Sequence, residues 1–384
     1  MPGATTPSLS SILHPQRILV RGVNWLGDAV MSTPALLRLR EARPFDHIVL
    51  LTPAKLVDLW TRHPALDGVL TFADGESVFS VARRLRSHRF DIALVLPNSP
   101  RSALEPFLGR IPRRIGYPRR WRRAFLTEWA TPRSGEVPMH RRSAREVRRL
   151  IAAPLVPQPL PLEAHHVYQY LPLATALGGK LEAVPPLVAV ADEEVRQIGK
   201  RFEFPVDRKE RPRLFGLNAG AAYGPAKRWP IDRFIASART LQERTGCHWW
   251  IFGGPAEVPQ ANAMVREIQA AHSELPESVR SLAGQTSLRE LAAALKACDV
   301  VLTNDSGPMH LAAAVGTPVV ALFGSTSPEL TGPGLPGDAR HVLLRADAPC
   351  APCFRRVCPI DFRCMTGISV ERVVQAVFGS GEAI

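Results

Sequence analysis

Apolar segments of strand length alternate with helix-length segments through both halves of the chain. In the first half the expected strands are residues 17–21, 47–51 and 91–96, and the helices are 29–42, 54–62 and 77–87. In the second half the strands are 214–218, 248–252, 300–303 and 319–323, and the helices are 231–245, 256–271, 287–297 and 309–315. Strands that alternate with helices form mostly parallel sheets with helices on both faces. This pattern predicts an α/β fold with two doubly wound domains.

A proline-rich stretch near residues 151–190 separates the two halves. It includes "IAAPLVPQPLPLEA", an expected helix at 165–177, and "EAVPPLVAV". We therefore expect a polar tail at 1–16, an N-terminal domain at 17–180 and a C-terminal domain at 181–384. Two such domains leave a cleft between the carboxyl ends of their strands, where ligands commonly bind.

Composition excludes several other classes of protein. The 384 residues are 46% hydrophobic and 22% charged, as in ordinary globular proteins. The longest apolar run, 311–324, contains Gly, Thr and Pro and is shorter than the roughly 20 residues that a membrane span needs. Residues 1–16 lack the charged and apolar regions of a signal peptide. Cys247 and Cys298 lie in apolar segments, which indicates a reducing compartment such as the cytoplasm.

Positive charge is concentrated in residues 101–150. That segment holds 14 Arg and 4 Glu, which is +10 of the chain's net charge of +13. A solvated helix face usually mixes both signs of charge, so this segment favours an anionic partner: nucleic acid, anionic lipid or an anionic substrate.

The first strand runs into the loop "RGVNWLGDAV" and then a helix. A dinucleotide-binding fingerprint belongs at this position, but G-x-G-x-x-G is absent, which argues against a Rossmann dehydrogenase. Asp28 lies close to the start of the helix. It is either a helix cap or a carboxylate that faces the cleft.

Three loops of the second half follow strands of one expected sheet. The first, "NAGAAYGPAKRWP", contains Lys227; the second, "FGGPAE", contains Glu257; the third, "TNDSGPMH", contains Asp305 and His310. Lys227 can bind a phosphate, and Glu257 can accept hydrogen bonds from ribose hydroxyls. A loop that opens a helix N-terminus suits an anion. Together the loops predict a site for a nucleoside diphosphate, although each residue alone has an ordinary structural explanation.

The chain resembles the bacterial glycosyltransferase family 9 heptosyltransferases. The stretches "GVNWLGDAVMSTPAL", "LPNSPRSAL", "NAGAAYGPAKRWP", "FGGPAE", "NDSGPMHLAAAVGTPVVALFGSTSPELTGP" and "CAPCFRRVCPIDFRCM" carry the resemblance in order from residue 17 to about 368. It implies a GT-B fold, in which two Rossmann-like domains face a cleft. It also implies transfer of L-glycero-D-manno-heptose from ADP-heptose to a heptose of the lipopolysaccharide inner core, with inversion and without a metal cofactor.

The resemblance also implies roles for particular residues. Asp28 matches the general base, and the donor-binding residues are Ala221, Ala222, Lys227, Glu257, Asp305, Ser306, Gly307 and His310. Relatives often have polar residues at the two alanines, so backbone amides would have to serve there. The basic segment then becomes the acceptor-binding region, with Arg101, Arg113, Arg114, Arg119 and Arg120 as candidates. We expect no metal ligand in the site.

Four cysteines, Cys350, Cys353, Cys358 and Cys364, lie close enough in sequence to be metal ligands, but their spacing is compressed relative to zinc knuckles. We expect a reduced, metal-free loop near the donor site. The implied partners are ADP-heptose, the lipopolysaccharide acceptor and the anionic inner face of the inner membrane, with no nucleic acid. The alternatives are another GT-B enzyme of the cell envelope, a nucleotide-sugar epimerase, or a nucleic-acid-binding protein whose binding would be salt-sensitive.

Overall fold

The computed structural model describes residues 15–133, 135–153, 160–207, 211–270 and 278–382. The chain forms two compact units. Unit 1 comprises Met1–Glu136 and His166–Ala189, and unit 2 comprises Val137–His165 and Val190–Ile384. This grouping differs from the expected division after residue 180, because the segment Val137–His165 packs with the second unit and 181–189 with the first.

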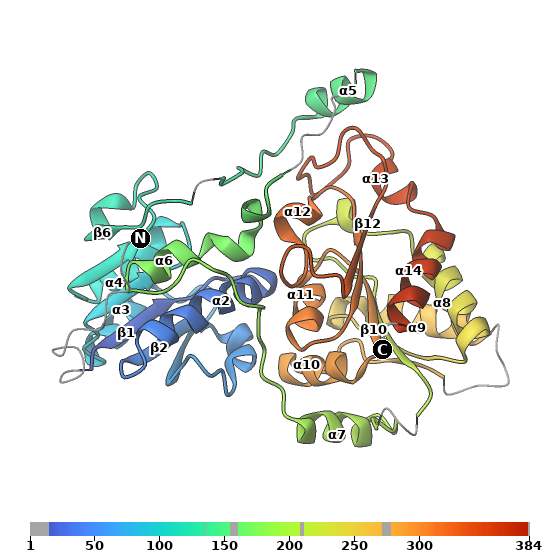
Figure 1. The fold of residues 1–384 in the computed structure, drawn as a ribbon, viewed down its shortest axis with the longest axis horizontal. Coiled ribbons are helices and arrows are strands. Elements are labelled where there is room, and N and C mark those ends of the chain that lie inside the picture. The colour runs from blue at the N-terminus through green and yellow to red at the C-terminus, as the bar shows by residue number, and fades with distance from the viewer. Residues whose placement is uncertain (1–14, 134, 154–159, 208–210, 271–277, 383–384) are drawn as a thin grey trace. The chain divides into compact units, whose positions relative to one another are not determined.

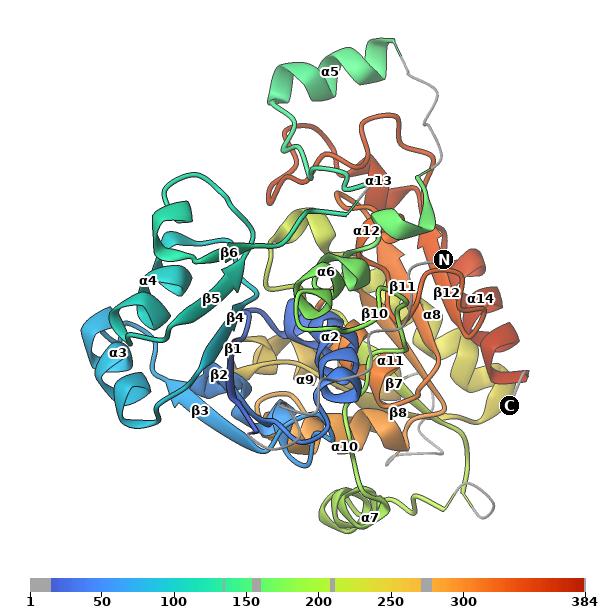
Figure 2. The ribbon, with the colours of Figure 1, turned by 60° about the vertical axis from the view of Figure 1, so that its left-hand side comes forward.

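Unit 1, the part of the ribbon coloured mainly blue and cyan in Figure 1, contains a parallel six-stranded sheet in the order β3-β2-β1-β4-β5-β6, which can be followed in Figure 2. Its strands are β1 (Arg17–Arg21), β2 (His47–Pro53), β3 (Gly68–Phe72), β4 (Ile92–Val95), β5 (Arg113–Gly116) and β6 (Glu128–Trp129). Its α-helices are α2 (Leu26–Ala42), α3 (Val78–Ser87), α4 (Pro100–Leu108) and α6 (Leu171–Thr175), with 3-10 turns at Ala54–Trp60, Arg123–Phe125 and His166–Gln169. The middle of the central strand β1 is buried: Ile18 and Leu19 have no exposed surface.

Unit 2 contains a second parallel sheet, in the order β12-β11-β10-β7-β8-β9. Its strands are β7 (Leu214–Asn218), β8 (His248–Ile251), β9 (Val279–Ser281), β10 (Val300–Asn304), β11 (Val319–Phe323) and β12 (His341–Arg345). Its helices are α5 (Ala144–Ala152), α7 (Asp192–Arg201), α8 (Ile231–Thr245), α9 (Val258–Gln269), α10 (Leu288–Ala297), α11 (Gly307–Ala314), α12 (Pro328–Thr331), α13 (Arg363–Thr366) and α14 (Val370–Glu382). Short 3-10 turns lie at Leu162–Ala164, Pro225–Lys227 and Pro255–Glu257.

Both sheets have the same doubly wound strand order. In each, the first strand is central, the next two strands extend to one side and the remaining three to the other. The order therefore reverses between β1 and β4 in unit 1 and between β7 and β10 in unit 2. Loops at the carboxyl ends of such adjacent strands splay apart and form the usual binding crevice of this fold. The expected α/β class with two doubly wound halves is confirmed.

Strongly periodic segments match their expected elements closely. Residues 17–21, 214–218, 231–245 and 319–323 form the expected elements within the same bounds. The expected helix at 165–177 is wrong: it is broken into a 3-10 turn at His166–Gln169 and the short α6, which has a proline in its first turn. Among the described residues, no helix is both long and apolar enough to cross a membrane.

Candidate active site

An ion pair joins two loops at the point where the strand order of unit 2 reverses. Lys227 ends the 3-10 turn after β7, and Asp305 directly follows β10. The Nζ atom of Lys227 lies 2.6 Å from Oδ2 of Asp305, and the hydroxyl of Thr326 donates to the same oxygen at 2.5 Å. Asp305 is only 3% exposed. A buried carboxylate therefore holds the ammonium group at the carboxyl edge of the sheet.

Side-chain amides fix the loops around this pair. Asn218, the last residue of β7, donates from Nδ2 to the hydroxyls of Thr303 and Ser306 at 3.0 Å. Asn304, the last residue of β10, donates to the carbonyl oxygen of Ala219 at 2.7 Å. Each loop is thus bonded to the end of the neighbouring strand, which fixes the geometry of the edge.

The helix α11 begins at this edge. Ser306 is its N-cap, but its side chain makes no capping hydrogen bond, because its hydroxyl is engaged with Asn218. The first backbone N–H groups of a helix have no intrahelical acceptor and bear partial positive charge, so they suit an anionic ligand. His310 lies one turn into the helix and is buried.

Glu257 brings the loop after β8 to the same edge. Its Oε2 accepts a hydrogen bond from the backbone N–H of Gly254 at 2.8 Å. Its other carboxylate oxygen packs against Gly220, where a Cβ atom would lie only 2.0 Å away. Only glycine is therefore compatible with this position of the carboxylate. Of the two alanines in the β7 loop, Ala221 is buried and Ala222 is exposed.

The cysteine loop, residues 350–364, supports the Lys227 loop. The hydroxyl of Tyr223 donates to the carbonyl oxygen of Phe354 at 2.7 Å, and the N–H of Ala226 donates to that of Arg356 at 3.0 Å. At Gly224, where φ is +150°, a Cβ would lie 2.6 Å from the carbonyl oxygen of Arg356. The cysteine loop therefore lies beside the Lys227 loop; that it borders a donor site stays a prediction.

The thiols of that loop lie close enough to affect one another. Burial, together with the other three thiols, raises the pKa of Cys364 to about 12. The helix α5 lies next to the loop (Figure 2). Its Val147 packs with Cys350 and Cys353 and so covers them. Within the described ranges, no group of three or more His, Cys, Asp or Glu side chains is arranged to hold a metal ion. The metal-free state of the loop remains a prediction.

Asp28 lies in the first turn of α2, at the carboxyl edge of the sheet in unit 1. Trp25 is the N-cap of this helix, so Asp28 is not a helix cap. Burial raises the pKa of Tyr170 well above its ordinary value, and the negative charge of Asp28 acts in the same direction. A buried phenol that stays protonated therefore lies near the Asp28 carboxylate.

Most of the candidate acceptor arginines have partners within unit 1. Arg101 donates to Glu105 at 2.9 Å, Arg113 forms a bidentate pair with Glu128 at 2.8 and 3.0 Å, and Arg119 donates to Glu136 at 2.5 Å. Arg114 donates to the carbonyl oxygen of Phe125 at 2.7 Å. By contrast, Arg120 is exposed and stacks on Trp121 with its guanidinium 5.5 Å from the ring centroid.

Arg113 and Arg114 begin β5 and therefore lie at the amino edge of a parallel sheet. The loop that carries Asp28 follows the carboxyl end of β1. These two arginines are thus at the opposite edge from Asp28, whereas Arg119 and Arg120 follow the carboxyl end of β5. Sequence patterns alone could not make this distinction, because the arginine-rich strand has no apolar periodicity.

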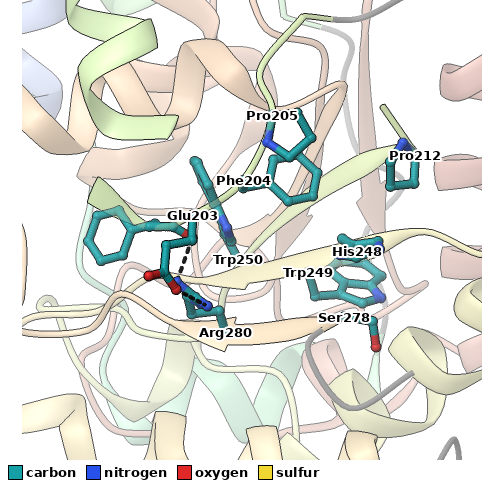
Figure 3. Close-up of a pocket in the computed structure, with 10 residues that line it drawn as sticks. Glu203, Phe204, Pro205, Pro212, His248, Trp249, Trp250, Ser278 and Arg280 are labelled. Atoms are coloured by element: carbon teal, nitrogen blue, oxygen red, sulfur yellow. Dashed lines mark hydrogen bonds and ion pairs between the residues drawn. The ribbon is translucent and has the colours of Figure 1, made fainter. Parts of the chain in front are cut away.

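A cavity of about 290 Å³ lies in unit 2 but away from this edge. Phe204, His248, Trp250 and Arg280 line it, and Arg280 pairs with Glu203 at 3.5 Å (Figure 3). His248 is the first residue of β8, so the cavity borders the amino edge of the sheet. It is separate from the loops that carry Lys227, Glu257 and Asp305.

Comparison with known proteins gives consistent matches. The family model Glycosyltransferase family 9 (heptosyltransferase) matches residues 78–362. Lipopolysaccharide heptosyltransferase 2 of Salmonella typhimurium is 31% identical over 338 residues, which cover 85% of this chain and 88% of the relative. Lipooligosaccharide heptosyltransferase 2 of Haemophilus ducreyi is 32% identical, covering 83% and 86%. The solved ADP-heptose lps heptosyltransferase II of E. coli superposes with a TM-score of 0.73 at 26% identity, covering 96% and 99%.

Proposed function

Because the chain belongs to glycosyltransferase family 9, the heptosyltransferases, we propose that it transfers L-glycero-D-manno-heptose from ADP-heptose to a heptose of the lipopolysaccharide inner core. The observation that carries the donor assignment is the Lys227–Asp305 ion pair at the strand-order reversal of unit 2. The expected family, enzyme class and two-domain α/β fold are confirmed.

In this proposal unit 2 binds the donor. Lys227 and the N-terminal amides of α11 bind the diphosphate and stabilise the negative charge that develops as ADP leaves. Asp305 acts through Lys227, because its buried carboxylate fixes the position of the ammonium group. Glu257 accepts hydrogen bonds from the ribose hydroxyls. The positive charge of Lys227 and of the N-terminal amides of α11 stabilises the leaving ADP without a metal ion.

The backbone completes the donor site in this assignment. Ala221 and Ala222 offer no side-chain hydroxyl, so their amides approach the phosphates directly. Ser306, Gly307 and His310 surround the start of α11, and Ser306 has a positioning role because its hydroxyl bonds Asn218.

We assign the general base to Asp28 in unit 1. Inverting transfer needs a group that takes the proton of the acceptor hydroxyl as this oxygen attacks the anomeric carbon. The Asp28 carboxylate lies in the first turn of α2, at the carboxyl edge of the sheet in unit 1. The buried Tyr170 nearby stays neutral and so adds no competing charge.

The acceptor carries carboxylates and phosphates, which the arginines of unit 1 attract. Of Arg101, Arg113, Arg114, Arg119 and Arg120, the exposed Arg120 is the most available for such contacts. We further propose a cytoplasmic enzyme that associates peripherally with the anionic inner face of the inner membrane, where basic side chains gain electrostatic attraction.

The alternatives have less support. The two relatives named above, which span more than four fifths of the chain, are heptosyltransferases 2 rather than epimerases. Four arginines of the basic segment, Arg101, Arg113, Arg114 and Arg119, are bonded within the protein, which reduces the positive charge available to a nucleic-acid backbone.

The decisive experiment incubates the purified enzyme with ADP-heptose and two core acceptors, one ending in a single heptose and one lacking heptose. Mass spectrometry should show the addition of one heptose to the first acceptor only. Addition to the heptose-free acceptor alone would assign a different core heptosyltransferase. Failure with both acceptors, alongside an active control enzyme, would overturn the proposal.

A further inference from the structure

Arg122 is a fully buried cation at the carboxyl edge of the sheet in unit 1. Its side chain has no exposed surface. Its Nη1 donates to the carbonyl oxygen of Pro97 at 2.5 Å and to Oδ1 of Asn98 at 3.1 Å. Both acceptors follow β4, which pairs with β1, the strand that leads into the Asp28 loop. Arg122 therefore lies at the same edge of the sheet as the candidate base.

One side of this guanidinium lacks partners. Its Nε and Nη2 atoms are buried, and neither has a hydrogen-bond partner among the residues that the structure describes. Burial, together with the positive charge of Arg119, lowers the pKa of Arg122 to about 10. The group is still charged at neutral pH. A buried charge without a counter-ion is unfavourable, so its presence needs an explanation.

The two unpartnered atoms, Nε and Nη2, are the ones through which other arginines of this chain bind carboxylates. Arg113 binds both oxygens of Glu128 through Nε and Nη2, at 2.8 and 3.0 Å. Arg289 binds Glu194 through the same two atoms, both at 2.6 Å. Two parallel N–H groups match the geometry of a carboxylate or a phosphate.

The main chain is adapted to this arginine. Gly116, the last residue of β5, lies so close that a Cβ atom there would be 2.8 Å from Nη2 of Arg122. Any other residue at position 116 would displace the guanidinium. Glycine thus allows the cation to lie directly against the end of the strand.

We propose that Arg122 is an oxyanion-binding residue of the acceptor site, which holds a carboxylate or phosphate group of the substrate through Nε and Nη2. This inference rests on the proposed function, since it assigns the anion to the acceptor. Both atoms are inaccessible to solvent in the free protein, so the surrounding loop has to move when the anion binds. The bonds of Nη1 to Pro97 and Asn98 keep the guanidinium oriented during this movement.

The first test needs no turnover. Thermal unfolding is measured with inorganic phosphate and with chloride at equal ionic strength, for the wild type, Arg122→Gln, Arg122→Lys and the control Arg83→Gln, which changes an exposed arginine of α3. We expect the Tm of the wild type to rise with phosphate concentration and to level off. The rise should be smaller in Arg122→Gln, because this variant lacks the phosphate site at Arg122. Other phosphate sites, such as the Lys227 loop, are unchanged by the substitution and cancel in the comparison.

The two Arg122 variants separate a binding role from a structural one. In chloride alone, Arg122→Gln should unfold within a few degrees of the wild type, because it removes an uncompensated charge together with two hydrogen bonds. Arg122→Lys should keep its Tm in chloride and bind phosphate more weakly, since it lacks the fork. An unchanged phosphate response in both variants would overturn the proposal. So would failure of both to fold, which would make Arg122 a structural residue.

The second test identifies the anion. With an intact core acceptor, Arg122→Lys should raise the acceptor KM roughly tenfold or more, with the KM for ADP-heptose unchanged. The measurement is repeated after the phosphate esters of the acceptor have been removed. If the difference between variant and wild type disappears, the ligand is a phosphate; if it persists, the ligand is a carboxylate. An unchanged KM with intact acceptor would overturn the proposal.

The two tests also separate this inference from the proposed function. If the wild type transfers no heptose, the proposed function fails, and the phosphate response of Arg122 can still be present. If transfer occurs and neither Tm nor KM depends on Arg122, only the oxyanion site fails.

Discussion

The Nζ atom of Lys227 lies 2.6 Å from Oδ2 of Asp305, and the two residues come from loops that follow neighbouring strands, β7 and β10. The Asp305 carboxylate is therefore bonded to Lys227 and is not exposed at the edge of the sheet, where a ligand would bind. Asp305 therefore affects a bound nucleotide only by positioning the ammonium group of Lys227.

This geometry predicts non-additive effects on nucleotide binding. Lys227→Ala should weaken the binding of ADP, measured by calorimetry, by about 1–3 kcal/mol, because a charged hydrogen bond is lost. Asp305→Ala should also weaken binding. The double variant should bind about as weakly as Lys227→Ala alone, since residues that act as one unit do not add.

The chain offers a matched control for this experiment. Lys296 forms an ion pair with Asp192 at 2.9 Å in the same unit, away from the loops of the site. Lys296→Ala should leave ADP binding unchanged. Wild-type affinity in both Lys227→Ala and Asp305→Ala would contradict the donor site.

Asp28→Asn should remove catalysis without removing the fold. Asparagine is nearly the same size, and Asp28 is not the N-cap of α2, so helix capping is unaffected. The amide cannot accept the acceptor proton, and kcat should fall by a factor of ~10²–10⁴. Binding of ADP-heptose should remain within a few-fold of the wild type. The exposed Asp74, which pairs with Lys55, provides the control variant Asp74→Asn. Turnover near the wild-type rate would place the base elsewhere.

Charge reversal should separate the arginines of unit 1 by position. Arg120→Glu should raise the acceptor KM and reduce its dependence on salt, with donor binding unchanged, because exposed charges act through screened attraction. Arg113→Glu should instead lower Tm, since it breaks the bidentate pair with Glu128 and places two carboxylates together. If Arg120→Glu weakened donor binding equally, the division between donor and acceptor residues would be wrong.

The cysteine loop should react slowly and bind no metal. Cys358 is partly exposed, whereas Cys350, Cys353 and Cys364 are buried. Alkylation of the native protein should therefore modify Cys358 first and Cys364 last, because burial keeps the Cys364 thiol protonated. Metal analysis of protein purified without added metal should show no stoichiometric zinc or iron. One equivalent of either would contradict the expectation.

Stability should fall in mild acid because of His63. Burial lowers the pKa of His63 from 6.5 to about 4, so the folded state resists protonation. The unfolded chain takes up the proton below pH 6.5, and stability is lost as pH falls from about 6.5 to 4. At pH 5 this loss is about 2 kcal/mol for the one residue.

The variant His63→Asn isolates that contribution. Asparagine can still accept the hydrogen bond that the N–H of Ala65 donates to the imidazole at 3.3 Å. Denaturant unfolding of both proteins at pH 7.5 and pH 5 should show a smaller loss for the variant. An equal loss in both proteins would mean that His63 does not titrate on unfolding.

The sequence predicts those parts of the fold whose apolar pattern is strong. β1, β7 and β11 match their expected bounds because they are central strands with β-branched and apolar residues on both faces. The edge strands β6 and β9 have only two and three residues, which is too short for a pattern to emerge. β5 was missed because two of its four residues are arginines.

The sequence predicts those residues of the candidate site that lie in loops directly after a strand. Lys227, Glu257 and Asp305 follow three adjacent strands of one parallel sheet, so their common edge follows from the order of the elements. Arg122 and Tyr170 could not be found this way. The importance of Arg122 depends on which of its nitrogen atoms lack partners, and nothing in an arginine-rich run distinguishes one arginine from another.

The chain passes from unit 1 to unit 2 after Glu136, returns after His165, and passes again after Ala189. A gene fragment that starts at residue 190 would therefore encode an incomplete unit. It would lack α5, and the surface of Cys350 and Cys353 that Val147 covers would be open to water and to aggregation. To produce unit 2 alone, Val137–His165 would have to be rejoined to it by a new linker, so a single cut in the proline-rich stretch cannot separate two intact halves.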